Sequence, residues 1–429
     1  MGGPMTGGIQ RWPLSYAQSA RLARDRINGP VPFNVNASFD VDGHIDAERL
    51  RGALTQLMRS HPALRGHLTP DGTAMLVPDE VTPELIVRTG LTADQVQAEV
   101  TAEADRFRDR RQGPLWSSQL LTRSDGRQVL TLAFDHLVMD ASSLDIVLTD
   151  LAAGTTRVPD PAGPDSYGAF AAEQHARYGA GHPPSLGYWQ QHLAGTALNR
   201  PVVPKFCLDP VGPLSGRRTS ARIEFDDRER RSVVSGAASQ RVTVFTAYLA
   251  AVAAVLAESS GERDVTFRVL THGRRPPFIS TVGWFANMVL VRLRFADPLD
   301  LVSLLATVRE TWLRQLPHQS VPYPLVLRWV EPERTISDYR PSVVTVNAFT
   351  PAPPVRFGSA RLIGRPDPGG LAEEAGLHFM LGHGANVLTI DCWHDPLRYA
   401  VADVAELLAA LKQRLLSIAD LPRPVRRRA

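Results

Sequence analysis

Cysteine is nearly absent from this sequence, with only Cys207 and Cys392 in 429 residues. Two cysteines cannot form a disulfide framework, and these two lack the spacing of a zinc site, so we expect a reducing environment. The N-terminus lacks the basic-then-apolar pattern of a signal peptide, and no apolar run approaches the roughly 20 residues of a membrane span. These absences predict a soluble, cytoplasmic protein with no membrane partner.

Features typical of nucleic-acid, phosphate and metal binding are also lacking. The formal net charge is only +3, and we interpret the basic tail at 423–428 as a solvated end. The sequence has no phosphate-cradling glycine loop, no basic patch interleaved with aromatic residues and no His/Cys cluster with metal-ligand spacing. We therefore expect no nucleic-acid partner and no metal or cofactor bound by the protein itself.

What the chain does have is the length and apolar content for two folded cores, since 44% of its 429 residues are hydrophobic. Strict alternation of apolar and polar residues from Phe33 to Val41 predicts a strand with one buried face. Frequent Gly, Pro and Ala ahead of a new ordered region at Tyr188 predict a linker at 166–187. We expect an N-terminal subdomain at 1–165 and a C-terminal subdomain at 188–429.

Helices and strands are expected in both halves, and the strands are not simply interleaved with helices. Apolar spacing predicts helices at 46–60, 93–109, 167–178, 244–258, 301–315 and 401–418, and strands at 119–121, 129–134, 222–225, 264–269, 288–293, 343–349 and 386–393. This pattern indicates the α+β class.

The chemistry-bearing stretch is the turn that follows the strand at 129–134. That strand ends in Asp135 and His136, and four residues later Asp140 precedes apolar residues at helical spacing. A histidine and a carboxylate thus share one strand-to-helix connection, where a substrate can reach an imidazole that acts as a base. With 12 histidines in the chain, however, a bare His-x-x-x-Asp arises about once by chance. The alternative is that Asp140 only caps the helix and His136 is an ordinary strand-end residue.

Six segments in order resemble the condensation domains of nonribosomal peptide synthetases, within the chloramphenicol-acetyltransferase-like acyltransferase superfamily. They are 13–18 (PLSYAQ), 61–65 (HPALR), 113–116 (GPLW) with the His136 turn, 188–189 (YW), 271–274 (THGR) with 282–287 (VGWFAN), and 318–323 (HQSVPY). The resemblance implies two chloramphenicol-acetyltransferase-like α+β subdomains that form a V-shaped pseudo-dimer, with the active site at their junction.

The family motif has two histidines, three variable residues and then Asp-Gly, and this chain departs from it at both ends. The second histidine and the aspartate are kept as His136 and Asp140, whereas the first histidine is Asp135 and the glycine is Ala141. The resemblance implies that His136 is catalytic. It also implies that Asp140 is structural and pairs with Arg274 of the Gly-Arg motif.

The two departures leave open how the site works. If Asp135 approaches the imidazole, its carboxylate favours the charged ring, whereas on the opposite side of the strand it only holds the loop. Glycine after the aspartate permits φ > 0 or close approach of a substrate, so the methyl group of Ala141 narrows the site.

Four further residues are candidates for contacts with substrate or with the tunnel of the family. Ser142 and Ser143 begin the predicted helix, where they either offer groups to a developing oxyanion or cap the helix. The resemblance places Trp284 and Asn287 near the tunnel, and the alternative for Trp284 is interface packing.

The resemblance implies a free-standing condensation enzyme of secondary metabolism. It would transfer an acyl or aminoacyl thioester, carried on the phosphopantetheine arm of an acyl or peptidyl carrier protein, to an amine or hydroxyl acceptor. Two alternatives remain open: a degenerate platform that binds a carrier protein or recruits a tailoring enzyme, and a different His-dependent reaction, such as cyclisation, elimination or epimerisation. The donor, the acceptor and the oligomeric state do not follow from the sequence.

Overall fold

The chain was analysed as a computed structural model. The structure describes residues 8–154, 159–179, 185–196, 202–209, 215–296, 299–333, 344–350, 355–365 and 376–422. The basic tail at 423–428 lies outside the described residues.

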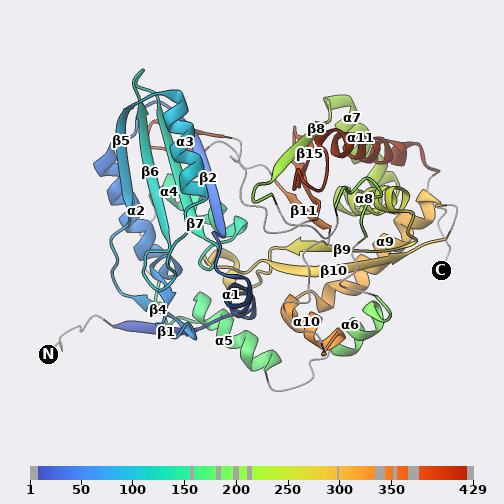
Figure 1. Cartoon of the computed structure of the whole chain (residues 1–429), viewed down its shortest axis with the longest axis horizontal. Coiled ribbons are helices and arrows are strands. Elements are labelled where there is room, and N and C mark those ends of the chain that lie inside the picture. Colours follow the sequence, from blue (N-terminus) through green and yellow to red (C-terminus); the bar gives the residue numbers. More distant parts are fainter. Residues whose placement is uncertain are drawn as a thin grey trace. The chain divides into compact units, whose positions relative to one another are not determined.

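The chain divides into two compact units, each with its own six-stranded sheet (Figure 1). The first unit comprises Met1–Pro183, His272–Ala286 and Ala352–Gly370, and the second comprises Pro184–Thr271, Asn287–Pro351 and Leu371–Ala429. The predicted α+β class, with two chloramphenicol-acetyltransferase-like subdomains, is confirmed.

The units differ from the predicted subdomains in three places, one of which is Ala352–Gly370, a segment of the predicted C-terminal subdomain that belongs to the first unit. The predicted linker contains a helix, Tyr167–Tyr178, whose residues Tyr167 and Phe170 are buried in the core of the first unit. Segment His272–Ala286, which the sequence assigned to the C-terminal subdomain, also belongs to the first unit. Its buried residues Phe278 and Phe285 lie in the same core, so apolar packing decides the assignment.

The first unit contains two sheets and five helices among its described residues. Its larger sheet has the order β12-β13-β2-β7-β6-β5, in which only β5 and β6 pair in parallel, and its smaller sheet has the order β1-β4-β3. The strands are β1 (Ile9–Pro13), β2 (Asn34–Asp42), β3 (His67–Leu68), β4 (Ala74–Pro78), β5 (Leu85–Leu91), β6 (Trp116–Arg123), β7 (Gln128–Asp135), β12 (Val355–Phe357) and β13 (Ala360–Gly364). The helices are α1 (Tyr16–Asn28), α2 (Ala47–Ser60), α3 (Ala93–Ala104), α4 (Ala141–Ala153) and α5 (Tyr167–Tyr178).

Strand β7 is buried along its whole length because helices cover both faces of its sheet. Leu130, Leu132 and Phe134 face the main core with α2 and α4, whereas Val129 faces Val96 and Val100 of α3. This two-sided packing follows from the alternation of side chains along a strand. It holds rigidly the strand end from which the His136 turn begins.

The second unit has the sheet order β10-β9-β11-β14-β15-β8, in which β11 pairs in parallel with both neighbours. Its strands are β8 (Thr219–Glu224), β9 (Asp264–Thr271), β10 (Asn287–Arg294), β11 (Thr345–Phe349), β14 (His378–His383) and β15 (Leu388–His394). Its helices are α6 (Leu186–Leu193), α7 (Asp227–Ser239), α8 (Val244–Ser260), α9 (Leu301–Gln315), α10 (Tyr323–Val330) and α11 (Val401–Ser417). Helix α8 is buried on nearly all sides, as its apolar composition predicted.

One predicted helix is wrong at its end. The helix expected at 93–109 stops at Ala104, and Thr92 caps its start together with Gln95. The chain leaves the helix because Arg108 and Arg110, both buried, turn toward acidic side chains of the first unit.

Candidate functional site

The His136 turn is fixed by backbone contacts on both sides. The amide of Asp135 donates to the carbonyl of Leu115 (2.8 Å), and the amide of His136 donates to the carbonyl of Phe33 (2.7 Å). Four residues later Asp140 caps α4, because its carboxylate accepts from the amide of Ser143 (2.7 Å). The turn is therefore a rigid connection between β7 and α4.

Asp140 is both a helix cap and the partner of Arg274. Its buried carboxylate accepts five hydrogen bonds, two of them from the Arg274 guanidinium at 2.8 and 3.0 Å. The other three come from backbone amides, namely that of Ser143 and those of Phe285 and Ala286, the last two at 2.9 Å each. With every lone pair engaged and both partners buried, this pair has a structural role.

Two glycines permit this network to form. Gly273 has φ +64°, and a Cβ there would lie 1.9 Å from the carbonyl oxygen of Phe285. A Cβ on Gly283 would lie 2.2 Å from the ring of Tyr167. Neither position has room for a side chain, which explains the glycines in the Thr271-His272-Gly273-Arg274 and Val282-Gly283-Trp284 segments.

Ser143 is occupied inside the network instead of facing a substrate. Its hydroxyl donates to the carbonyl of Gly283 (2.7 Å) and accepts from the amide of Gly283 (2.9 Å) and from Arg274 (2.5 Å). Ser142 is half-buried, and Ala141 is exposed as the first residue of α4. Of these three predicted substrate residues, Ser143 therefore stabilises the fold.

The imidazole of His136 forms a cluster with two aromatic rings, Phe33 and Trp284, which also contact each other with ring centroids 5.5 Å apart. It stacks on Phe33, with ring centroids 4.4 Å apart and an interplanar angle of 11°, and it lies 4.6 Å from Trp284. Its Nδ1 is buried and makes no hydrogen bond to another residue in the described part of the chain. The ring is only half-buried, so it is not sealed in a core.

Burial lowers the pKa of His136 below the usual range of histidine. The residue's own backbone and the negative charges of Asp140 and Asp135 act in the opposite direction, and Arg21 adds to the lowering. Because burial disfavours the charged ring most, the imidazole is neutral at pH 7 and able to accept a proton.

The carboxylate of Asp135 holds the loop, which is one of the two arrangements that the sequence left open, and its negative charge also acts on the pKa of His136. One carboxylate oxygen accepts from Nε of Arg110 (2.7 Å), and the other accepts from the amide of Leu137 (2.9 Å). The residue is 1% exposed, so its side chain is turned into the fold instead of contacting a substrate. The sequence did not point to Arg110. It lies two residues after Arg108, beyond the end of α3, and this spacing is not a recognisable motif.

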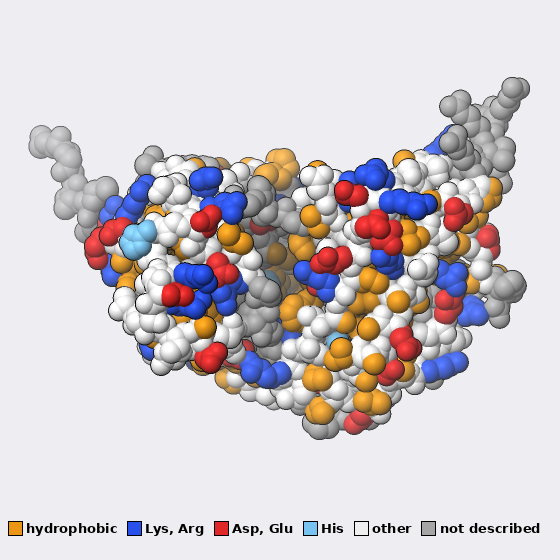
Figure 2. All heavy atoms as spheres, turned by 90° about the horizontal axis from the view of Figure 1, so that it is seen from above, with side chains coloured by type: hydrophobic (Ala, Val, Ile, Leu, Met, Phe, Trp, Pro, Cys, Tyr) orange, Lys and Arg blue, Asp and Glu red, His pale blue; other side chains and the backbone are white. Residues whose placement is uncertain are grey.

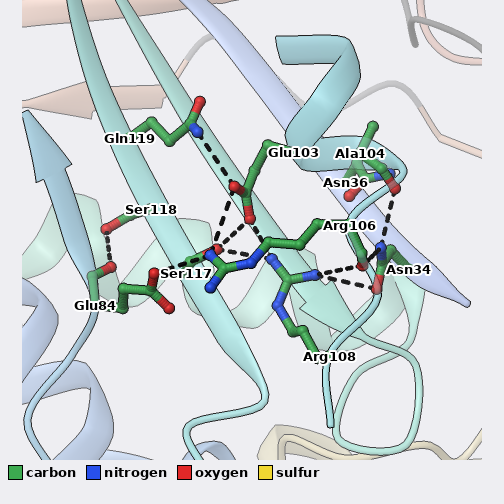
Figure 3. Close-up of polar contacts among 10 residues, drawn as sticks. All are labelled: Asn34, Asn36, Glu84, Glu103, Ala104, Arg106, Arg108, Ser117, Ser118 and Gln119. Carbon is green, nitrogen blue, oxygen red and sulfur yellow. Dashed lines mark hydrogen bonds and ion pairs between the residues drawn. The ribbon is translucent and has the colours of Figure 1, made fainter. Parts of the chain in front are cut away.

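The preceding arginine, Arg108, anchors the same segment in a separate network (Figure 3). Its guanidinium contacts the buried carboxylate of Glu103 and donates to the hydroxyl of Ser117 (2.7 Å) and to Asn34 (3.2 Å). Gln119 donates to the same carboxylate of Glu103 (3.1 Å). Two separate networks, one at Arg108 and one at Arg110, thus hold the segment after α3 against the sheet.

Trp284 is positioned through its backbone. The carbonyl of Trp284 accepts from the hydroxyl of Tyr167 (2.9 Å), which also lies 3.0 Å from the hydroxyl of Ser15. Burial raises the pKa of Tyr167, so the hydroxyl keeps its proton. Tyr167 and Phe33 are further residues of this region that the sequence analysis did not single out.

Asn287 belongs to the second unit and clamps a loop there. Its amide nitrogen donates to the carbonyls of Gln319 and Val321 (2.9 and 2.8 Å), and its oxygen accepts from the amide of Tyr323 (3.0 Å). These contacts use the whole amide group, so Asn287 holds the 318–323 segment instead of facing a substrate.

The surface and the remaining polar groups of the described residues do not indicate a further kind of ligand. No three His, Cys, Asp or Glu side chains of the described ranges lie close enough together to hold a metal ion. On the face drawn in Figure 2, basic and acidic side chains are interspersed instead of gathering by sign. Among the described helices, none alone has the length and apolar composition to cross a membrane. Helices α7 and α8 together have that length and composition, but they are bent by 97° relative to each other.

Comparison with known proteins decides the family. Residues 9–347 match the condensation domain. The chain belongs to the condensation domain family. The predicted class, an acyltransferase of the condensation type, is confirmed at the level of the family.

Among curated relatives of this condensation domain protein is phosphinothricin tripeptide synthetase PhsC of Streptomyces viridochromogenes, 30% identical over 350 residues. That match covers 76% of this chain and 31% of the relative. Chondramide synthase cmdD of Chondromyces crocatus is 26% identical, with 76% and 9% covered. This chain therefore spans a third or less of these relatives' length.

Solved structures share the fold at low sequence identity. The first condensation domain of the calcium-dependent antibiotic synthetase, in complex with a substrate analogue, has a TM-score of 0.77 at 19% identity, with 97% of each chain covered. The X-domain from teicoplanin biosynthesis, in complex with OxyB, has a TM-score of 0.81 at 18% identity, with 99% of this chain and 97% of the other covered. These likenesses concern the fold alone.

Proposed function

We propose that this condensation domain protein transfers an acyl or aminoacyl group from a carrier-protein thioester to an amine or hydroxyl acceptor, with His136 as the general base. The observation that carries the proposal is the half-buried imidazole that contacts Phe33 and Trp284 at the end of β7, where burial lowers its pKa and so favours the neutral ring. A base of this kind accepts protons at neutral pH.

In the proposed reaction one proton moves from the acceptor to His136 and then to the leaving group. Nδ1 of His136 is buried, so Nε2 is the nitrogen that takes the proton from the acceptor N–H or O–H. The acceptor atom then bonds to the thioester carbonyl carbon, the carbon–sulfur bond breaks, and the imidazolium returns the proton to the departing thiolate. The products are an amide or ester and the free thiol of the phosphopantetheine arm. No protein nucleophile is needed, because the thioester already has a good leaving group.

Asp140 and Arg274 take no part in these proton transfers. The carboxylate is fully engaged by five donors, which leaves none of its lone pairs for a substrate proton. We assign this pair to holding the turn and the Gly283–Ala286 backbone. Loss of activity on changing either residue therefore reports on the fold of the site.

The partners follow from the same proposal. The donor arrives on the phosphopantetheine arm of an acyl or peptidyl carrier protein, and the acceptor is a small molecule or a second carrier-bound group. The proposed reaction requires no cofactor bound by the chain itself.

The test is intact-mass spectrometry of an acyl-loaded carrier protein incubated with candidate amines and alcohols. Wild type is compared with His136→Ala and with His44→Ala, an exposed histidine outside the site. The proposal requires loss of the acyl group and a new amide or ester with wild type and His44→Ala. With His136→Ala the rate should fall by about 10²- to 10⁴-fold, the usual contribution of a general base.

Two other outcomes identify the alternatives. Unchanged acyl-carrier mass with wild type, together with measurable binding of the carrier, favours a recruitment platform. A mass change without transfer to an acceptor favours a different His-dependent reaction on the tethered group. The likeness in fold to the teicoplanin X-domain does not favour either outcome, because a shared fold supports several functions.

A further inference from the structure

A row of four buried charges of alternating sign runs behind the His136 turn within the first unit. Arg21 pairs with Asp25 (3.0 Å), Asp25 with Arg110 (2.5 Å), and Arg110 with Asp135 (2.7 Å). None of the four residues is more than 8% exposed. We call these four residues the charge row.

Each end of the charge row is connected to His136 indirectly. Asp135 precedes His136 in the chain, and its carboxylate accepts from the amide of Leu137, on the other side of the histidine. At the opposite end, the guanidinium of Arg21 lies 4.2 Å from the ring centre of Phe33, which stacks on His136. One end is negative and the other positive, so their influences on the ring oppose each other.

Balance within the charge row depends on Arg110. This residue lies between two carboxylates, those of Asp25 and Asp135, and it bonds to both. Without it, two carboxylates would face the single positive charge of Arg21. In a buried site such an excess negative charge is poorly screened and acts strongly on a neighbouring imidazole.

We propose that Arg110 is a positioning residue of the condensation site, which holds the Asp135 carboxylate and thereby sets how readily His136 takes a proton. The inference rests on the proposed role of His136 as the base. It also accounts for a carboxylate where the family motif has a histidine: the negative charge at position 135 is tolerated because Arg110 neutralises it.

The other charged groups that act on the ring from the first unit do not replace this function. Besides Asp135 and Arg21, the imidazole is influenced by Asp140. That carboxylate is held by Arg274 through two hydrogen bonds, independently of Arg110. Phe33 and Trp284, which contact the ring, are uncharged.

The experiment measures the pKa of His136 directly, by NMR of protein with isotope-labelled histidine, with the His136 signal assigned from its absence in His136→Ala. The variants are Arg110→Met, Asp135→Asn and the double variant Arg110→Met/Asp135→Asn. Arg111→Met is the matched control, because it removes the same charge one residue along from an exposed side chain that bonds only to the carbonyl of Pro70 in the described structure.

Arg110→Met should raise the pKa of His136 by about one unit, the usual effect of a nearby uncompensated carboxylate. Asp135→Asn should lower it, and the double variant should return close to wild type, since it removes one charge of each sign. Arg111→Met should leave it unchanged. Equal shifts in Arg110→Met and Arg111→Met would overturn the proposal.

If Arg110→Met does not fold, the other two variants still decide. Asp135→Asn keeps Arg110 and the double variant lacks it, so their pKa values should differ by a comparable amount. Equal values would show that Arg110 has no influence on the ring.

Kinetics separate this inference from the proposed function. If both hold, the acid limb of the pH profile of kcat/KM moves upward in Arg110→Met by the same amount as the NMR pKa. If the pKa moves but no variant, including wild type, transfers an acyl group, the charge row is correct and the condensation function is wrong.

Discussion

Two carboxylates flank His136, and both are buried against an arginine, yet the molecule holds them differently. Asp140 accepts from one arginine and three backbone amides, two of them from the distant Phe285–Ala286 backbone. Asp135 accepts from one amide and shares its arginine with Asp25. Asp140 therefore fixes the backbone of a distant segment through its amides, whereas Asp135 ends a row of charged side chains.

This difference separates structural from electrostatic roles at one turn. Arg274 is the one cation that pairs with Asp140 in the described residues, so neither partner has a substitute. Arg110 keeps Asp25 when Asp135 is removed. We therefore expect stability to depend most on Asp140 and the proton affinity of His136 to depend most on Asp135.

The largest expected effect comes from Asp140→Ala. Its removal leaves the buried Arg274 guanidinium without a carboxylate, which should lower the free energy of unfolding by about 3 to 5 kcal/mol. Urea unfolding followed by circular dichroism gives this value. Asp125→Ala, in a surface ion pair of the β6–β7 turn, is the control, with an expected loss of no more than about 1 kcal/mol. Similar losses in both variants would contradict the structural role of Asp140.

Asp135→Asn should have a smaller effect on the same measurement, about 1 to 3 kcal/mol. Asparagine still accepts from the amide of Leu137, and Arg110 still pairs with Asp25. A loss as large as that of Asp140→Ala would remove the distinction between the two carboxylates.

Much of this arrangement could be predicted from the sequence, because it depends on local signals. The apolar run ahead of His136 and the helical spacing after Asp140 predicted β7 and α4, whereas the family resemblance, and no local signal, implied the pair of Asp140 with Arg274. Helix α7 could also have been found, since Asp226 and Glu229 form a capping box at its start.

The rest depends on contacts between segments far apart in the chain. Nothing local in the sequence connects Arg110 with Asp25, 85 residues earlier, or Phe33 with the ring of His136. Strand β13 pairs with β2 across more than 300 residues, β12 adds to β13 at the edge of the sheet, and the short apolar runs of both strands carry little periodicity. For the same reason the orientation of Asp135 stayed open until its partner was known.

The pH dependence tests whether the arginines neutralise both carboxylates. The folded-state pKa of His136 is lowered by burial, so the acid limb of kcat/KM should lie below the free histidine value of about 6.5. For stability, the unfolded chain binds more protons than the folded one between these two pKa values. The contribution of His136 is thus fully present above about pH 6.5 and is lost as the pH falls through the folded pKa.

Burial also lowers the pKa values of other histidines, such as His192 and His394, so the stability measurement needs a reference. We expect the unfolding free energy of wild type, measured relative to that of His136→Gln, to decrease as the pH falls from 7 to 5. An acid limb above the free histidine value would mean that the carboxylates outweigh burial.

The smallest expected effect is at Ala141, next to Asp140, where the family motif has glycine. Ala141 is exposed and forms the first residue of α4, so its backbone is helical and a positive φ is not required. Ala141→Gly should cost less than about 1 kcal/mol in urea unfolding, the helix-propensity difference. Ala93→Gly, at the exposed first residue of α3, is the matched control for that cost.

If kcat/KM for bulky acyl donors rises in Ala141→Gly and not in Ala93→Gly, the methyl group narrows the approach to His136. If the two variants behave alike, the departure at position 141 is neutral, and Asp135 with its arginine is the one that sets this site apart.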